Sequence, residues 1–249
     1  MNIGIYQSAA SLSALERWQD SVTQNIASSQ LPGYRKRNVD FSAQESGQLQ
    51  TGSVSQQSAD TAQATVFPTA TNSINFLPGE AQPTGRELDV AIQGNGFFEV
   101  QAADGSHAFT RNGSFEIQPD STITTSSGEK VLNEGGSPIT LLPGGGPVVI
   151  NPDGSITQNG ASLGKLSIQK FADTTQLTPG PDGTFVPMAG TAPIPVDKPD
   201  VLQGYLESSN VSPMHEMVDL ITISRAYESN QKMITTVDQE MQKTLDALG

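Results

Sequence analysis

The chain has 249 residues and a formal net charge of −13 at neutral pH; 35% of its residues are hydrophobic and 6% are aromatic. This low apolar content, with 24 glycines and 16 prolines, argues against one large core and favours turns and short strands in the middle of the chain. The acidic charge excludes nucleic acid as an expected partner, and the absence of cysteine excludes disulfides and thiolate metal sites.

The first predicted element is a helix over residues 3 to about 29. Gln19 interrupts its apolar stripe, and Leu31-Pro32-Gly33 ends it, because the residue before proline is biased away from helix. The apolar residues follow the heptad spacing of a coiled-coil seam, at Ile5, Leu12, Leu15, Val22 and Ile26.

The middle of the chain divides into an extended connector over residues 31–87 and a β-rich domain over residues 88–210. Alternating apolar residues at 88–92 and 97–101 flank the turn Gly94-Asn95-Gly96. This pattern predicts a β-hairpin.

The strand pattern continues beyond that hairpin. Asn112-Gly113 is expected to join strands at 107–111 and 114–117 into an antiparallel meander. The fold class predicted for the chain is therefore mainly β with α-helical termini. Later strands are predicted at 146–150, 165–171 and 184–188.

The last predicted element is a helix over residues 213–248, with Pro213 in its first turn. Asn230 and Thr244 are polar breaks in its stripe, and polar residues inside a seam tend to fix register and partner. The stripe residues are Leu220, Ile223, Tyr227, Ile234, Val237, Met241 and Leu248.

These two stripes permit two arrangements. Residues 1–30 and 211–249 can pack on each other as one coiled-coil-like domain, or the helices can pair with neighbouring subunits, since both need the same spacing. The residues of both stripes are therefore the candidate subunit-interface residues.

One sequence motif suggests catalysis. Gly160-Ala161-Ser162-Leu163-Gly164 matches the elbow of serine hydrolases, but that chemistry needs a strand-to-helix turn and a histidine base. A strand pattern follows Gly164, and neither His107 nor His215 has an evident route to Ser162. We expect no catalytic residue, cofactor or metal site, and no enzyme activity.

Several segments, in the same order along the chain, resemble the flagellar hook and basal-body rod protein family. One departure from the family pattern is Ser28, where asparagine usually follows the alanine. The resemblance lies at residues 6–10, 24–27 and 32–36 near the N-terminus, 88–98 and 109–115 in the centre, and 203–211, 216–221 and 225–228 near the C-terminus.

The resemblance implies a structural subunit that polymerises through its terminal helices into the axial drive shaft carrying torque from motor to hook. The middle is short for a hook protein, so a rod subunit is expected, and the proximal rod type is favoured over the distal one. The implied partners are further copies, neighbouring rod and hook subunits, the surrounding basal-body rings and the flagellar type III export apparatus.

The implied location is the periplasmic rod, reached without a cleavable signal peptide. The N-terminus lacks a signal-peptide pattern, and no apolar run approaches the roughly 20 residues that span a bilayer. Two alternatives to a rod subunit stay open. A non-flagellar secreted binding module would keep its activity without residues 213–249, and a hydrolase would lose turnover on Ser162→Ala.

Overall fold

The computed structural model describes residues 3–48 and 64–247. Packing divides the chain into two compact units. The first, which we call the helical unit, comprises Met1–Ala27, Arg37–Ser73 and Ser212–Gly249. The second, which we call the β unit, comprises Ser28–Lys36 and Ile74–Val211.

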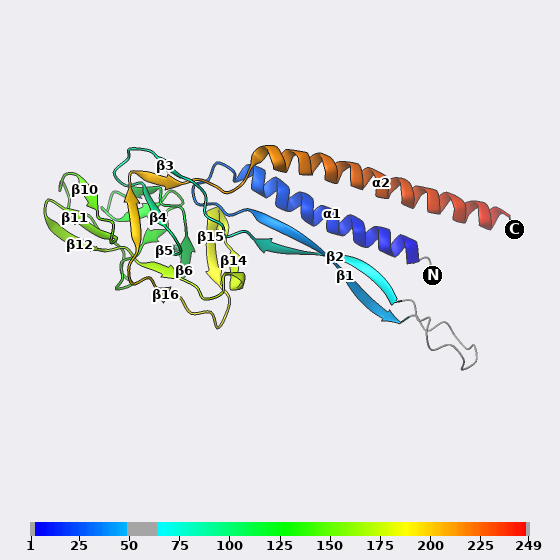
Figure 1. Ribbon diagram of the computed structural model, residues 1–249, viewed down its shortest axis with the longest axis horizontal. Helices are drawn as coiled ribbons and strands as arrows, with labels where there is room; N and C mark the ends of the chain where they lie inside the picture. The colour runs from blue at the N-terminus through cyan, green and yellow to red at the C-terminus, as the bar shows by residue number, and fades with distance from the viewer. Residues whose placement is uncertain (1–2, 49–63, 248–249) are drawn as a thin grey trace. The chain divides into compact units, whose positions relative to one another are not determined.

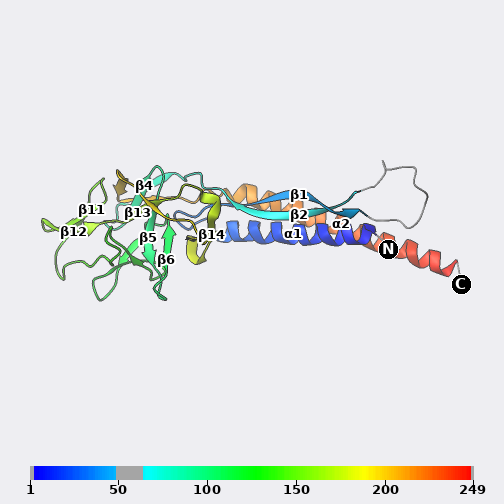
Figure 2. The same cartoon turned by 90° about the horizontal axis from the view of Figure 1, so that it is seen from below.

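In the helical unit, α1 (Ile3–Ala27) and α2 (Pro213–Asp246) run side by side in opposite directions (Figures 1 and 2). β1 (Arg37–Gln48) pairs with β2 (Ala64–Ile74), and β1 packs along α1. Both helices end within two residues of their predicted ends. Neither described helix contains an apolar stretch long enough to cross a membrane.

Local chemistry explains where α2 begins. The Ser212 hydroxyl lies 3.0 Å from Nδ1 of His215, and the Glu216 amide donates to the Ser212 carbonyl at 3.1 Å. Pro213 occupies the first helical position, where a missing N–H costs nothing, and the acidic Glu216 suits the positive end of the helix dipole.

The β-hairpin of the helical unit is fixed to α1 by an aromatic and a polar contact. The rings of Trp18 and Phe41 meet edge to face with centroids 5.5 Å apart. Arg17 donates from Nη1 to the carbonyl of Ala70 at 3.1 Å. The two strands are joined on their exposed side by hydroxyl contacts such as Ser42 with Thr69, 2.8 Å apart.

The β unit is built around a nine-stranded antiparallel sheet. The order along its main path is β14-β15-β6-β5-β9-β8-β7, and β13 joins β5 while β16 joins β13. These strands are β5 (Phe97–Gln101), β6 (His107–Thr110), β7 (Phe115–Ile117), β8 (Ile123–Thr125), β9 (Lys130–Val131), β13 (Ile168–Lys170), β14 (Leu177–Pro179), β15 (Thr184–Pro187) and β16 (Ile194–Pro195).

Smaller sheets and two 3-10 turns complete the unit. The small sheets pair β10 with β11 and β11 with β12, β4 with β17, and β3 with β18. Their strands are β3 (Ala81–Pro83), β4 (Val90–Gln93), β10 (Val148–Ile150), β11 (Ser155–Gln158), β12 (Ala161–Lys165), β17 (Asp200–Gln203) and β18 (Tyr205–Glu207), and the turns are η1 (Thr174–Gln176) and η2 (Pro181–Gly183).

Two cores lie on opposite sides of β5. Phe98 is fully buried in the larger cluster, with Phe115 and Ile123 among its members. Phe97, its neighbour in sequence, belongs to a separate aromatic cluster, because successive strand residues point to opposite faces. That cluster brings Phe97 within 5.6 Å of Phe185, ring centroid to ring centroid.

The fold-class prediction is confirmed: paired terminal helices accompany an antiparallel β-rich centre. The predicted hairpin between 88–92 and 97–101 is wrong. β4 pairs with β17, and β5 pairs with β6, β9 and β13. Alternation fixes which face of a strand is buried, but it does not select the partner strand.

The predicted pairing of strands 107–111 and 114–117 is also wrong, since β6 pairs with β5 and β15 while β7 pairs with β8. Gly113 marks a close approach of two backbones. The Val90 amide donates to the Gly113 carbonyl at 3.0 Å, and a Cβ atom on Gly113 would lie 1.7 Å from the Val90 carbonyl oxygen. The three-part domain division with a connector at 31–87 stays a prediction.

Candidate functional site

An apolar seam joins α1 and α2 within one chain. Leu15, Val22 and Ile223 are buried together in it. Burying each such side chain contributes roughly 1.5–3 kcal/mol, so the seam is the main support of the helix pair. The partly buried residues around it are Trp18, Ile26, Leu220 and Ala226.

Five of the twelve predicted interface residues therefore contact each other in the intrachain seam. Leu12, Tyr227, Ile234 and Val237 are half-buried, and Met241 is exposed. The side chain of Ile5 and the whole of Leu248 lie outside the described residues. A role for any of them in contacts with other subunits stays a prediction.

A buried polar contact lies at one end of the same helix pair. Asn25 donates from Nδ2 to Glu216 Oε2 and to the Arg37 carbonyl, each at 2.9 Å. The Arg37 amide donates back to Asn25 Oδ1 at 2.9 Å. Asn25 thus ties α1, α2 and the start of β1 together at one point, a role that its spacing in the sequence did not reveal.

A shallow hollow of about 310 Å³ opens on the helix pair. The predicted stripe break Gln19 lines it from α1, and two predicted interface residues, Leu220 and Tyr227, line it from α2 beside Ser224 and Glu228. At the level of Gln19, the polar break in the stripe, side chains therefore do not fill the seam between the two helices.

α2 carries a second apolar row, which our sequence analysis missed. Its residues are strongly exposed, from 50% at Met217 to 75% at Met214. Ile221 in this row and Ile223 in the seam are two residues apart, so about 3.6 residues per turn places them on roughly opposite sides of the helix. The signal was present as the helical spacing of Met214, Met217, Val218 and Ile221.

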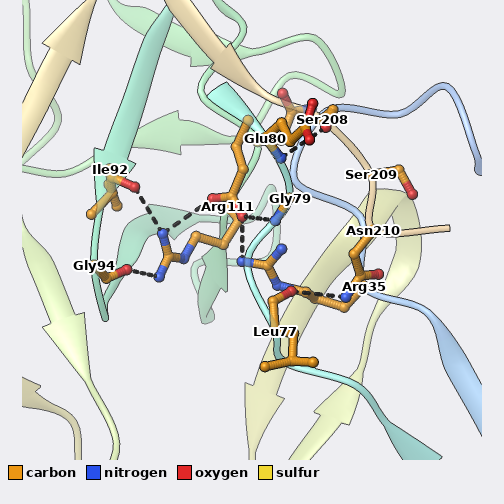
Figure 3. Close-up of polar contacts among 12 residues, drawn as sticks. Arg35, Leu77, Gly79, Glu80, Ile92, Gly94, Arg111, Ser208, Ser209 and Asn210 are labelled. Atoms are coloured by element: carbon orange, nitrogen blue, oxygen red, sulfur yellow. Dashed lines mark hydrogen bonds and ion pairs between the residues drawn. The ribbon is translucent and has the colours of Figure 1, made fainter. Parts of the chain in front are cut away.

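Inside the β unit, Glu207 holds two buried arginines, Arg35 and Arg111. Figure 3 shows the contacts of Arg111 with Ile92 and Gly94 as dashed lines. Its Oε1 lies 2.6 Å from Nη2 of Arg35, and its Oε2 lies 3.1 Å from Nη1 of Arg111. Arg111 also donates to the carbonyls of Ile92 and Gly94 and covers the Phe97 ring at 5.5 Å. The cluster joins the segment after α1, the end of β6 and the strand before α2.

The charges in this cluster do not balance, because two guanidinium groups face one carboxylate. Burial lowers the pKa of Arg111, the Glu207 carboxylate raises it, and the neighbouring Arg35 lowers it again, so that the pKa lies below its usual value. The Glu207 carboxylate is therefore the counter-charge that the two guanidinium groups share.

Residues 161–165 of the hydrolase-like segment form β12, whereas the sequence placed the strand after Gly164. Ser162 lies in β12 opposite Thr157 of β11 and is exposed, and no strand-to-helix turn is present there. His107 contacts Glu99 instead, with Nδ1 and Oε1 2.7 Å apart.

Two family descriptions match parts of the chain. Residues 91–158 match "Flagellar hook protein FlgE/F/G D1 domain", and residues 202–247 match "Flagellar basal body rod FlgEFG protein C-terminal". The first match runs from β4 to β11, and the second begins within β17 and covers β18 and α2. The first match therefore lies wholly in the β unit, and the second includes α2 of the helical unit.

Full-length relatives are also known. The chain is 32% identical to "Flagellar basal-body rod protein FlgF" of Caulobacter vibrioides, over 100% of this chain and 99% of the relative. The FlgF protein of Salmonella typhimurium is 31% identical over 96% of this chain and 95% of its own length. "Flagellar basal-body rod protein FlgG" of Agrobacterium fabrum is 39% identical, over 65% of this chain and 64% of the relative.

Proposed function

We propose that this chain, which belongs to the flagellar basal-body rod protein family, is the proximal rod subunit of the FlgF type and polymerises through its terminal helices. It is a structural component of the bacterial flagellar basal body and not an enzyme. Likeness to FlgF proteins extends over the whole chain, whereas likeness to the FlgG protein of Agrobacterium fabrum covers about two thirds of it. This difference in coverage favours the proximal type.

The observation that carries the polymer proposal is the two-sided character of α2. One side of its first turns is sealed against α1 through Ile223, and the opposite side exposes Met214, Met217, Val218 and Ile221. A neighbouring subunit that covers this row with a different surface makes a heterologous contact, and such contacts generate open helical filaments when the rotation does not close. A rod is an assembly of that kind.

We propose that a neighbouring rod subunit covers the exposed row on α2. This row is a better candidate surface than the stripe residues that are already buried in the seam. The half-buried Tyr227, Ile234 and Val237 follow the helical spacing of the seam residue Ile223, and we propose them as a second contact surface of α2. Neighbouring copies, adjacent rod and hook subunits and the surrounding rings are the proposed partners. The flagellar type III export apparatus is the proposed route to a periplasmic rod.

The test compares Ile221→Ser with Gln231→Ser, two changes on exposed positions of α2. Ile221→Ser should leave the free energy of unfolding within about 0.5 kcal/mol of wild type, because the side chain is exposed in the free subunit. It should abolish rod assembly and swimming, whereas Gln231→Ser should preserve both. Normal rods and swimming with Ile221→Ser would rule out the proposed surface.

The position along the rod needs a separate measurement. Labelled copies of the chain should be found at the motor end of purified basal bodies. Label at the hook end would assign the chain to the distal rod instead, and recovery of the chain only outside basal bodies would rule out the rod function itself.

A further inference from the structure

We infer that Glu207 and Asn210 form a clamp that holds together the chain segments running between the helical unit and the β unit, and that this clamp bears load in the assembled rod. The inference rests on the proposed function, because only a subunit of a drive shaft carries torque. The part of it that concerns the isolated chain is tested separately below.

The chain passes between the two units four times, after Ala27, Lys36, Ser73 and Val211. Three segments of the β unit adjoin these crossings: residues 28–36, residues 74–80 and residues 205–211. A short segment without cross-links acts as a hinge, since local opening there costs little free energy. Bonds among the three segments hold the β-unit ends of these crossings together.

Glu207 links all three segments. Its backbone carbonyl accepts from the Gly33 amide at 2.7 Å, and its carboxylate binds Arg35 in the same segment. Its Oε1 also accepts from the Gly79 amide at 2.9 Å. With Glu207 and both arginines buried, water does not compete for these bonds, and each is electrostatically stronger than on the surface.

Asn210 repeats the same linkage three residues further on. Its Oδ1 accepts from the Lys36 amide at 2.7 Å, and its Nδ2 donates to the carbonyls of Asn75 and Leu77 at 2.9 and 2.8 Å. Figure 3 shows the contact of Asn210 with the Leu77 carbonyl as a dashed line. Its amide uses both its acceptor and its donor ends, so no other residue type of this size satisfies all three contacts.

The remaining bonds complete a continuous set. The Asn75 amide donates to the Lys36 carbonyl at 2.9 Å, which joins the first two segments directly. The Ser208 amide donates to the Glu80 carbonyl at 2.8 Å, and the Glu80 amide donates to Ser208 Oγ at 3.1 Å. A force that pulls on any one segment is therefore shared by the other two.

Hydrogen exchange on the full chain tests the clamp itself. Asn210→Ala should make the peptides covering 28–36 and 74–80 exchange about tenfold faster, since it removes three bonds. Asn210→Asp retains an acceptor for Lys36 but cannot donate, so 74–80 should exchange faster while 28–36 stays protected. Wild-type protection in both segments of Asn210→Ala would overturn the clamp.

The control for both variants is Asn133→Ala, which removes only the contacts of Asn133 Oδ1 with the Gly135 and Ser137 amides in its own turn. It should leave exchange at 28–36 and 74–80 unchanged. Faster exchange of those segments in this control would also overturn the clamp, because loosening would then not depend on Asn210.

A swimming assay tests the load. In cells that depend on this chain for motility, Asn210→Ala should support swimming in dilute medium and lose it in viscous medium, while Asn133→Ala should swim in both. Failure of the wild-type chain to restore any motility would contradict the proposed function. Equal swimming of the two variants at high viscosity, with wild type functional, would overturn only the load-bearing role.

Discussion

The side-chain amide of Asn25 donates to the Glu216 carboxylate at 2.9 Å, and both side chains are fully buried although 191 residues separate them in the chain. Burying polar groups in an apolar seam costs free energy unless they are hydrogen-bonded. Other alignments of the two helices would break the bond between Asn25 and Glu216, so this contact disfavours them. In this chain it fixes where α1 ends relative to the first turn of α2, before any neighbouring subunit binds.

Asn25→Ala should therefore destabilise the helix pair by about 1–3 kcal/mol, because it withdraws a hydrogen-bond donor from a buried carboxylate. Urea unfolding followed by the fluorescence of Trp18, the single tryptophan, measures this. Thr23→Ala, at an exposed position of the same helix, is the control and should change stability by less than about 0.5 kcal/mol. Equal stability of the two variants would contradict the role assigned to Asn25.

Substitutions of two isoleucines on α2 should distinguish a residue that stabilises the folded chain from one that contributes to assembly. Ile223 is 1% exposed and Ile221 is 55% exposed. Ile223→Ala should lower the free energy of unfolding of the monomer by about 2–5 kcal/mol, whereas Ile221→Ala should change it by less than about 0.5 kcal/mol. Thermal unfolding of dilute protein checks both values. A larger loss at Ile221 than at Ile223 would show that the assignment of the two faces is wrong.

Two glycines with nearly the same backbone conformation should differ in their tolerance of a methyl group. Gly33 has φ +70° and Gly85 has φ +72°, but a Cβ at Gly33 would lie 2.3 Å from the Arg111 carbonyl carbon, and one at Gly85 would meet nothing within 4 Å. Gly85→Ala should cost about 1–2 kcal/mol from φ alone, and Gly33→Ala more than about 3 kcal/mol. Denaturant midpoints of the two variants provide the measurement, and similar midpoints would contradict it.

Glu129 should make stability fall as pH rises. Burial, and after it the nearby Asp182, raise the pKa of Glu129 above its usual value. The carboxyl of Glu129 then keeps its proton to a higher pH in the folded state than in the unfolded state. The free energy of unfolding therefore decreases as the pH rises from the unfolded-state pKa to the folded-state pKa. Glu129→Gln should stabilise the chain at about pH 7 but not at about pH 3.

Urea unfolding at the two pH values provides the measurement for Glu129. Glu116→Gln, at an exposed position of β7, is the control and should show no such pH-dependent gain. A gain from Glu129→Gln that is as large at low pH as at neutral pH would show that ionisation of Glu129 is not the cause.

The sequence determined the helices, because their signals are local. Heptad spacing placed α1 and α2 within two residues of their ends, and Pro32 and Pro213 mark where one helix stops and the other starts. Alternation likewise located seven of the fifteen strands described between residues 88 and 210, namely β4, β5, β6, β7, β10, β13 and β15. The segments that resemble the family occur in the same order at both ends and in the middle of the chain. They sufficed to identify the family, because the resemblance depends on which residues are present and not on which residues are in contact.

Only the tertiary structure decided which elements meet. β4 pairs with β17 rather than with its neighbour β5, because a period of two sets the buried face and leaves the partner open. The same limit hid Glu207, whose contact with Arg111 spans 96 residues and follows no repeat. The apolar stripes could not show that Ile223 would be sealed inside the chain and Ile221 left exposed, because burial depends on the partner that the fold supplies.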